Sequence, residues 1–214
     1  MKLFLAISLL VLTSPLSRAD FTFGGGDIPQ NSYVGLVSVG TVSGVLGHVT
    51  DMSLNLTVNG GFNGDLYAYL VGPDHTTSAQ LLGDLGGNNT QVGSGYNNIT
   101  LNSSGSQGIQ SVAQTWATPL SGHYTPVVDL MTTFGSYINA HGANGDWRLF
   151  IANQSTGGQS ALGGWSLNFT TTAVPEPEQV VAISLLGLIG LMVGCYRNWG
   201  RALGLKKFDP LELE

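Results

Sequence analysis

The sequence predicts an all-β protein, an antiparallel jelly-roll β-sandwich, followed by one C-terminal transmembrane helix. Three observations carry this prediction. Short runs with apolar residues at every second position alternate with turns rich in Gly, Asn and Ser. No stretch of residues 20–173 keeps an apolar period of 3.6 residues over three turns. A single uninterrupted apolar run lies near the C-terminus.

Residues 1–19 have the pattern of a secretory signal peptide. Lys2 provides the positive charge, residues 3–12 form an apolar core, and small residues around Ala19 suit a cleavage site. This core of ten residues is too short to cross a bilayer as a helix. We therefore expect the mature chain to begin at Asp20 and the exported domain to cover residues 20–173.

The first clear strands of that domain lie in its N-terminal half. Residues 52–58 are apolar at every second position and end at Asn-Gly-Gly, which favours a turn. Residues 66–71 are continuously apolar, as expected for a strand buried on both faces, and they stop at Gly72-Pro73-Asp74.

Two further strands end the domain. Alternation puts Trp147, Leu149 and Ile151 on the face opposite Arg148 and Phe150. Residues 165–169 repeat that pattern. Before them, residues 127–137 could form a short α- or 3₁₀-helix after Pro126. Two Asn-Gly-Asp triplets, residues 63–65 and 144–146, lead into strands and are interpreted as turns, because Asn-Gly favours positive φ.

The C-terminal part is predicted to be a membrane anchor. Residues 174–179 form a Pro-rich linker, and residues 180–196 contain no charge; a helix of 17 residues is roughly 26 Å long, close to the thickness of a bilayer core. The basic cluster with Arg197 and Arg201 follows, so by the positive-inside rule residues 197–214 form a cytoplasmic tail.

The order of Val174, Pro175, Glu176 and Pro177, an apolar helix and a basic cluster resembles the PEP-CTERM sorting signal of Gram-negative bacteria. That resemblance implies processing by a membrane-embedded exosortase near the Val-Pro-Glu-Pro box, and release to the cell surface or transfer into an extracellular polysaccharide matrix. The alternative is an ordinary C-terminal anchor after a linker stiffened by proline.

A second resemblance covers residues 35–170. Its pieces are Gly64-Asp65-Leu66 with Gly72-Pro73, then Pro119-Leu120-Ser121-Gly122, then Gly145-Asp146-Trp147-Arg148-Leu149, and finally Trp165 and Leu167. Together they resemble the P domain (P/Homo B) of subtilisin-like proprotein convertases. The resemblance implies a galactose-binding-like jelly roll that stabilises a neighbouring protease and performs no chemistry itself.

Charge restricts the possible partners. Residues 20–179 hold ten Asp and Glu against Arg148 alone, a net charge of −9 with neutral histidines. Such a domain repels phosphate backbones, which argues against nucleic-acid binding. Neutral glycans, cations or basic proteins suit it better. The single cysteine, Cys195, lies in the C-terminal apolar run, so the exported domain has no internal disulfide.

No catalytic residues are predicted. The sequence contains no Gly-x-Ser-x-Gly, and its four histidines show no zinc-binding spacing. Calcium is the possible cofactor, with Asp65, Asp84 and Asp146 as candidate ligands, because carboxylates in Asn-rich loops suit a hard cation. The alternative is that these aspartates bond nearby turn amides.

For ligand contact we select Tyr96 and Trp116, aromatic residues in or beside loop-rich segments. The sequence as a whole predicts a non-enzymatic exported protein, anchored in the membrane or sorted by an exosortase, with a structural or glycan-binding role. Its partners would be the exosortase, extracellular polysaccharide or envelope protein, and the membrane. The alternative is an accessory P-domain module of a subtilisin-like serine endopeptidase system.

Overall fold

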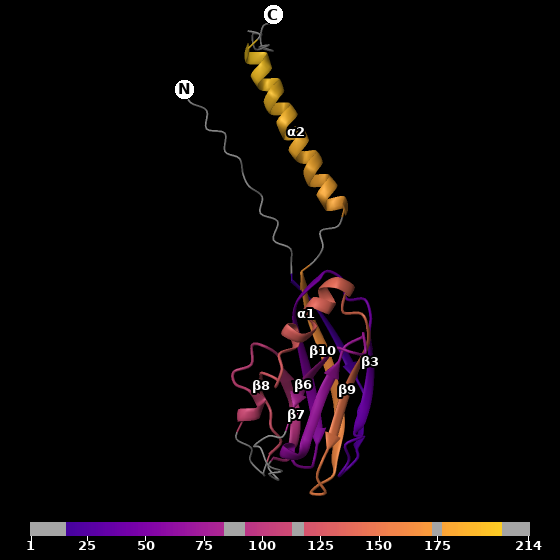
Figure 1. Cartoon of the computed structure of the whole chain (residues 1–214). Helices are drawn as coiled ribbons and strands as arrows, with labels where there is room; N and C mark the ends of the chain where they lie inside the picture. The colour runs from indigo at the N-terminus through magenta and orange to yellow at the C-terminus, as the bar shows by residue number, and fades with distance from the viewer. Residues whose placement is uncertain (1–15, 84–92, 113–117, 173–176, 203–214) are drawn as a thin grey trace, which may run out of the picture. The chain divides into compact units, whose positions relative to one another are not determined.

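The computed structural model describes residues 16–83, 93–112, 118–172 and 177–202. The chain divides into two compact units, Met1–Ala173 and Val174–Glu214. In the first unit, two β-sheets pack against each other (Figure 1).

Sheet A has six strands and sheet B has four. Sheet A runs in the order β1 (Leu16–Phe23), β10 (Ser160–Thr172), β4 (His48–Asn59), β7 (Gly95–Leu101) and β8 (His123–Tyr124), and β2 (Gly26–Ile28) also pairs with β10. Sheet B runs in the order β3 (Leu36–Val42), β9 (Gly145–Asn153), β5 (Leu66–Val71) and β6 (Ser78–Leu82).

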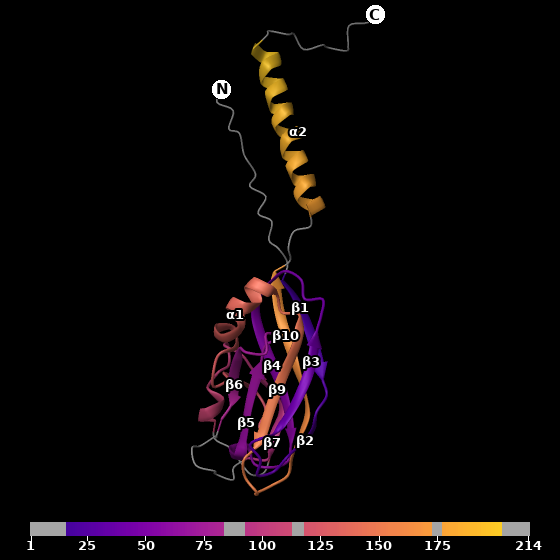
Figure 2. The same cartoon turned by 45° about the vertical axis from the view of Figure 1, so that its right-hand side comes forward.

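The strand pairs are nested along the chain, as in a jelly roll (Figure 2). The innermost pair is β5 with β6. It is enclosed in the sequence first by the pair of β4 and β7, then by that of β3 and β9, and last by that of β1 and β10. All four pairs are antiparallel. The predicted all-β sandwich is confirmed. The sheets are not wholly antiparallel, because β8 runs parallel to β7.

The core lies between the sheets and consists of the alternating residues that the sequence placed on one face. Trp147 is fully buried, with its ring centroid 5.0 Å from that of Phe134 and 5.9 Å from that of Phe169 on sheet A. Its Nε1 donates a hydrogen bond of 2.9 Å to the carbonyl of Ala143. Trp147 thus joins the two sheets and helix α1 at one point.

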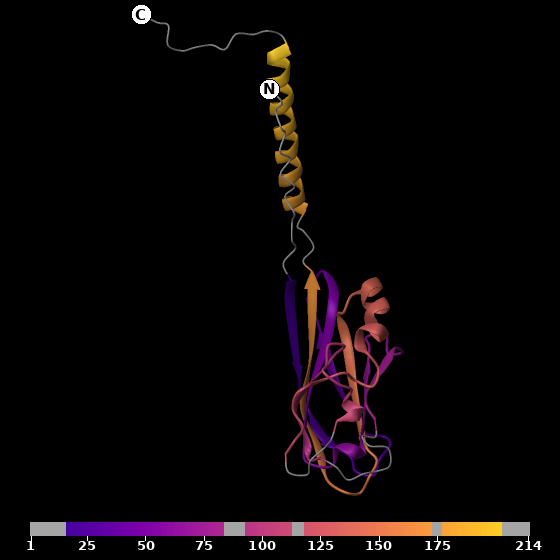
Figure 3. The same cartoon turned by 90° about the vertical axis from the view of Figure 1, so that its left-hand side faces the viewer.

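Helix α1 (Leu130–His141) lies beside the strand ends (Figure 3). It begins three residues later than the predicted helical segment, because Asp129 is the N-cap and accepts a 2.7 Å hydrogen bond from the Thr132 amide. The helix buries Leu130, Phe134 and Ile138. A 3₁₀-helix, Ile109–Ser111, precedes it in the chain.

Both Asn-Gly-Asp triplets connect distant parts of the chain through the asparagine side chain. Asn63, in the 3₁₀-helix Asn63–Asp65, accepts from the Gly95 amide at 2.6 Å and donates to the Gly95 carbonyl at 3.0 Å. Asn144 makes the same two bonds with Val45. The predicted turn is present at the first triplet, where the Asp65 amide donates to the Phe62 carbonyl at 3.2 Å, but neither Asn63 nor Gly64 has the positive φ that Asn-Gly favours.

The turn after β5 contains a carboxyl group with an altered pKa. Partial burial raises the pKa of Asp74, but hydrogen bonds donated by Thr77 and Thr76 outweigh it and hold the pKa below the ordinary value of 3.8. A lowered pKa adds stability above the unfolded-state pKa, and this stability is lost as pH falls below about 4.

We expect Asp74→Asn to destabilise the domain at pH 7 and to reduce its loss of stability in acid, as measured by urea unfolding from pH 7 to pH 2.

Strand β1 begins inside the predicted signal peptide. Leu16 to Ala19 pair with Thr172 to Phe169 of β10, and Arg18 forms an exposed ion pair of 2.7 Å with Asp20. Cleavage after Ala19 would leave Asp20 to Phe23 as the mature strand. The proposed cleavage predicts that the intact mass of the exported protein places its N-terminus at Asp20, whereas a mass that includes residues 16–19 would contradict it.

The second unit contains helix α2 (Pro177–Ala202). Its described side chains include Leu186, Leu191 and Met192, which are 68%, 69% and 67% exposed. Among the residues that the structure describes, no helix is both long enough and apolar enough to cross a membrane. The predicted transmembrane helix over residues 180–196 is therefore not supported by the structure.

Candidate functional site

The outer face of sheet A is a ladder of small polar side chains. In the strand register, Thr22 of β1, Ser166 of β10, Asn55 of β4 and Thr100 of β7 form one row across the sheet. The next row contains Asp20, Asn168 and Ser53, and Asn168 Nδ2 donates to Ser53 Oγ at 3.3 Å. This face therefore offers hydrogen-bonding groups from four adjacent strands.

Two β-bulges flank Thr57, one in each strand that pairs with β4. The register of β10 against β4 shifts between Leu162 and Gly164, and that of β7 against β4 shifts between Leu56 and Val58. Bulges open the ladder locally and are frequent beside functional sites. The sheet is thus irregular at one level on both sides of β4.

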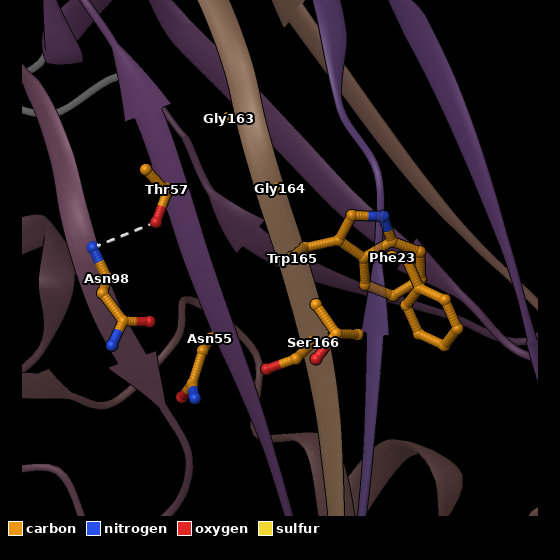
Figure 4. A pocket seen from close by; sticks show the side chains of 9 residues that line it. Phe23, Asn55, Thr57, Asn98, Gly163, Gly164, Trp165 and Ser166 are labelled. Atoms are coloured by element: carbon orange, nitrogen blue, oxygen red, sulfur yellow. Dashed lines mark hydrogen bonds between the residues drawn. The ribbon is translucent and has the colours of Figure 1, made fainter.

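Asn98 occupies the bulge in β7 with a left-handed backbone, φ 49°. The backbone amide of Asn98 donates to the side-chain Oγ1 of Thr57 at 3.3 Å (Figure 4). A left-handed asparagine within a strand is uncommon, and such residues concentrate at functional sites. The Asn98 side chain is exposed beside Thr57.

A groove of about 260 Å³ opens at the bulges. It is lined by residues of four strands: Thr22, Phe23, Gly163 to Ser166, Asn55, Thr57 and Asn98 (Figure 4). Gly163 and Gly164 leave room because they carry no side chain, and Phe23 packs against Trp165 with ring centroids 4.4 Å apart. The groove is slightly smaller than typical small-molecule pockets, which measure roughly 300–1,000 Å³.

Asn55 supplies the most informative group of the groove. Its Oδ1 is buried and has no hydrogen-bond partner. A buried acceptor without a partner is costly, and a donor from a bound molecule would satisfy it. None of the lining residues is ionisable. The groove therefore suits an uncharged molecule rich in hydroxyl groups and lacks the acid–base groups of a catalytic site.

The structure corrects the prediction for Tyr96. Its side chain is 1% exposed and belongs to the core, so it cannot contact a ligand at the surface. The bulge explains this, because an extra residue at Asn97-Asn98 lets both Tyr96 and Ile99 face inward although they are three positions apart. Burial raises the pKa of the Tyr96 hydroxyl well above its usual value. Trp116 lies outside the described residues.

The candidate calcium ligands are not brought together. Asp65 precedes β5 and Asp146 is the second residue of β9. Because these strands are antiparallel, the two residues lie at opposite ends of sheet B. Asp65 is 2% exposed, whereas Asp146 is exposed and accepts from Thr41 Oγ1 at 2.7 Å. Asp84 lies outside the described residues. Among the residues that the structure describes, no three His, Cys, Asp or Glu side chains lie close enough together to hold a metal ion.

The sorting residues are only partly described. Val174, Pro175 and Glu176 lie outside the described residues, and Pro177 is the first residue of α2. Arg197 and Arg201 belong to the last turns of that helix.

Sequence reasoning missed the groove, although two signals for it were present. An Asn-Asn pair interrupts the apolar pattern of residues 96–101, and a Gly-Gly pair interrupts that of residues 160–172. Glycine within a strand often marks a bulge or a close approach, and asparagine tolerates positive φ.

The solved structures that resemble the chain include two that contain the serine protease of Aeromonas sobria. One is its complex with a chaperone, with a TM-score of 0.43 and 15% identity over 75% of this chain and 28% of that chain. The other is of the protease itself, with a TM-score of 0.41 and 15% identity over 73% and 27%. The chain thus spans little more than a quarter of each of these two chains. TM-scores below 0.5 assign neither fold nor function, and no protein-family model and no curated protein matches.

Proposed function

We propose that the protein is a non-enzymatic, exported β-sandwich that binds neutral polysaccharide in the groove on the outer face of sheet A. The observation that carries this proposal is the buried Asn55 Oδ1 without a partner, in a groove lined only by uncharged residues. Sugar hydroxyl groups can donate to Asn55 Oδ1 and can accept from the side-chain amide group of Asn98. The net charge of −9 over residues 20–179 disfavours anionic polymers.

Affinity electrophoresis of the full chain in gels containing dextran, galactomannan or xylan tests this proposal. We expect at least one of these neutral polysaccharides to retard the protein, and alginate, an anionic polymer, to leave it unaffected. Lack of retardation by all three would contradict neutral-glycan binding. Turnover of a glycoside or peptide substrate by the purified chain would contradict the non-enzymatic role.

Removal of the unpartnered acceptor should weaken that binding. We expect Asn55→Ala to raise the dissociation constant about 3- to 10-fold, the equivalent of one hydrogen bond. Thr170→Ala is the matched control, because Thr170 faces the same side of β10 outside the groove. Equal affinity of both variants and the wild type would place the ligand elsewhere.

Asn98→Gly tests the contribution of the Asn98 side chain independently of the backbone bulge. Glycine adopts positive φ without strain, so the bulge should persist while the amide group is lost. We expect weaker binding with an unchanged free energy of unfolding. Unchanged binding would exclude the Asn98 amide group from the site.

We further propose that the exported protein is held at the membrane through the segment that begins at the Val-Pro-Glu-Pro box and is released by an exosortase-type enzyme. The exposed apolar side chains of α2 support this idea, because they need an apolar surface to cover them. Cell fractionation tests it: alanine replacement of Pro175 and Glu176 should retain the protein in the membrane fraction. An unchanged distribution would contradict processing at the box.

A second candidate is an accessory module of a subtilisin-like protease system. The P-domain resemblance over residues 35–170 favours it, and the residues behind that resemblance include the core residues Trp147 and Trp165. Co-purification of a subtilisin-like protease with the full chain, together with a lower thermal stability of that protease in a deletion strain, would support this role over glycan binding.

A further inference from the structure

The outer face of sheet B is largely apolar over β3, β9 and β5, whereas β6 adds the polar residues Gln80 and Ser78 to the same rows. Val37 of β3, Phe150 of β9 and Tyr69 of β5 lie opposite one another in one row, and the Tyr69 and Phe150 ring centroids are 6.5 Å apart. The next row holds Val39, Arg148 and Val71. Val37 and Val39 are 54% and 53% exposed. We call these six residues of β3, β9 and β5 the sheet-B face.

The loop before β3 also carries exposed apolar side chains. Tyr33 and Val34 are 77% and 82% exposed. The Ser32 amide donates to the Asn153 carbonyl at 3.0 Å, which holds the loop against the end of β9. Exposed apolar surface commonly marks a protein interface when it is extensive.

The charges of this face are self-complementary. Arg148 is exposed and is the only Lys or Arg in residues 20–179. Among the described residues, its guanidinium forms neither an ion pair nor a hydrogen bond. Asp146 is exposed two positions away on the same side of β9. Its Oδ1 accepts from Thr41, which leaves Oδ2 available. One positive and one negative group therefore stand side by side on the apolar surface.

We propose that the sheet-B face is the interface of a homodimer, in which Arg148 of each copy pairs with the partner's Asp146. A two-fold axis that crosses β9 between positions 146 and 148 places opposite charges against each other twice, as an isologous contact requires. Residues two apart on a strand are separated by only about 7 Å, so both pairs form together. Arg and aromatic residues are enriched at the centres of such interfaces.

The dimer would present its two polysaccharide grooves on opposite sides, because the outer faces of the two sheets point away from each other in a sandwich. It would then cross-link polysaccharide chains with an avidity above that of one groove. This consequence rests on the proposed function, whereas the dimer itself does not.

Sedimentation velocity of the detergent-solubilised full chain tests the dimer. We expect concentration-dependent dimerisation of the wild type. Arg148→Asp and Asp146→Arg should each weaken it at least about 30-fold, because each places like charges against each other. The double variant Asp146→Arg/Arg148→Asp should recover dimerisation to within about fivefold, because the exchanged charges are again complementary.

The controls separate this interface from other causes of association. Helix α2 is the same in all variants, so association through α2 would be equal in all of them. Asp51→Arg, on sheet A, should leave dimerisation unchanged, and circular dichroism establishes that each variant is folded. A monomeric wild type, association that is equal in all variants, or a double variant no better than the single ones would overturn the proposal.

Discussion

Trp147→Ala should lower the free energy of unfolding by about 3–5 kcal/mol, as expected for an aromatic side chain deleted from a packed core. The indole is fully buried, contacts Phe134 of α1 and Phe169 of sheet A, and bonds to the Ala143 carbonyl. Its removal leaves a cavity where three elements meet. Urea unfolding followed by circular dichroism measures the loss.

Two further variants give this prediction its controls. Trp147→Phe keeps an aromatic ring but leaves the Ala143 carbonyl without the Nε1 donor, so it should cost about 1–3 kcal/mol. Trp199→Ala makes the same substitution at a side chain of α2 that is 71% exposed, and it should leave unfolding of the sandwich unchanged. Equal stability of Trp147→Ala and Trp199→Ala would show that the indole does not join the sheets.

Asn63→Ala should cost about 2–4 kcal/mol. It leaves the buried Gly95 amide without an acceptor and removes one of two donors from the Gly95 carbonyl, which keeps its 3.0 Å bond from Leu120. Asn63 and Gly95 are both buried, so water cannot readily replace these bonds. Thermal and urea unfolding provide the measurement.

Asn144→Ala is the matched control for this loss. Asn144 makes the same pair of bonds with Val45, but it is exposed, so water can replace its side chain and we expect a cost of about 1 kcal/mol or less. A cost at least as large for Asn144→Ala would mean that burial does not determine the difference between the two asparagines.

Much of the fold could be predicted from the sequence because the core strands alternate strictly. Residues 52–58, 147–151 and 165–169 place the expected side chains in the core, since a period of two fixes the face of each residue in a strand. The run 66–71 was predicted to be buried on both faces, but it is buried only at alternate positions. The apolar outer face of sheet B explains why the sequence hides this alternation.

The groove could not be predicted, because it depends on two bulges that lie on different strands. Each bulge breaks the period of two, and the break at Asn97-Asn98 also turns Tyr96 inward, which is why Tyr96 was predicted wrongly. That both bulges lie beside Thr57 follows from the pairing of β4 with β7 and β10, strands far apart in the chain. Sequence alone gives no register between them.

The position of β10 has a mechanical consequence. The chain leaves the sandwich at Thr172, the end of β10. This strand pairs with β4 from Ala161 to Thr172 on one side, and on the other side with β2 at its start and with β1 from Trp165 onward. After the predicted cleavage behind Ala19, the remaining part of β1, Asp20 to Phe23, pairs with Asn168 to Trp165. A pulling force applied between the groove and Thr172 would run along β10, perpendicular to the hydrogen bonds of the ladders on both sides. Those bonds would be sheared together instead of being unzipped one after another, a loading geometry suited to a domain tethered by its last strand.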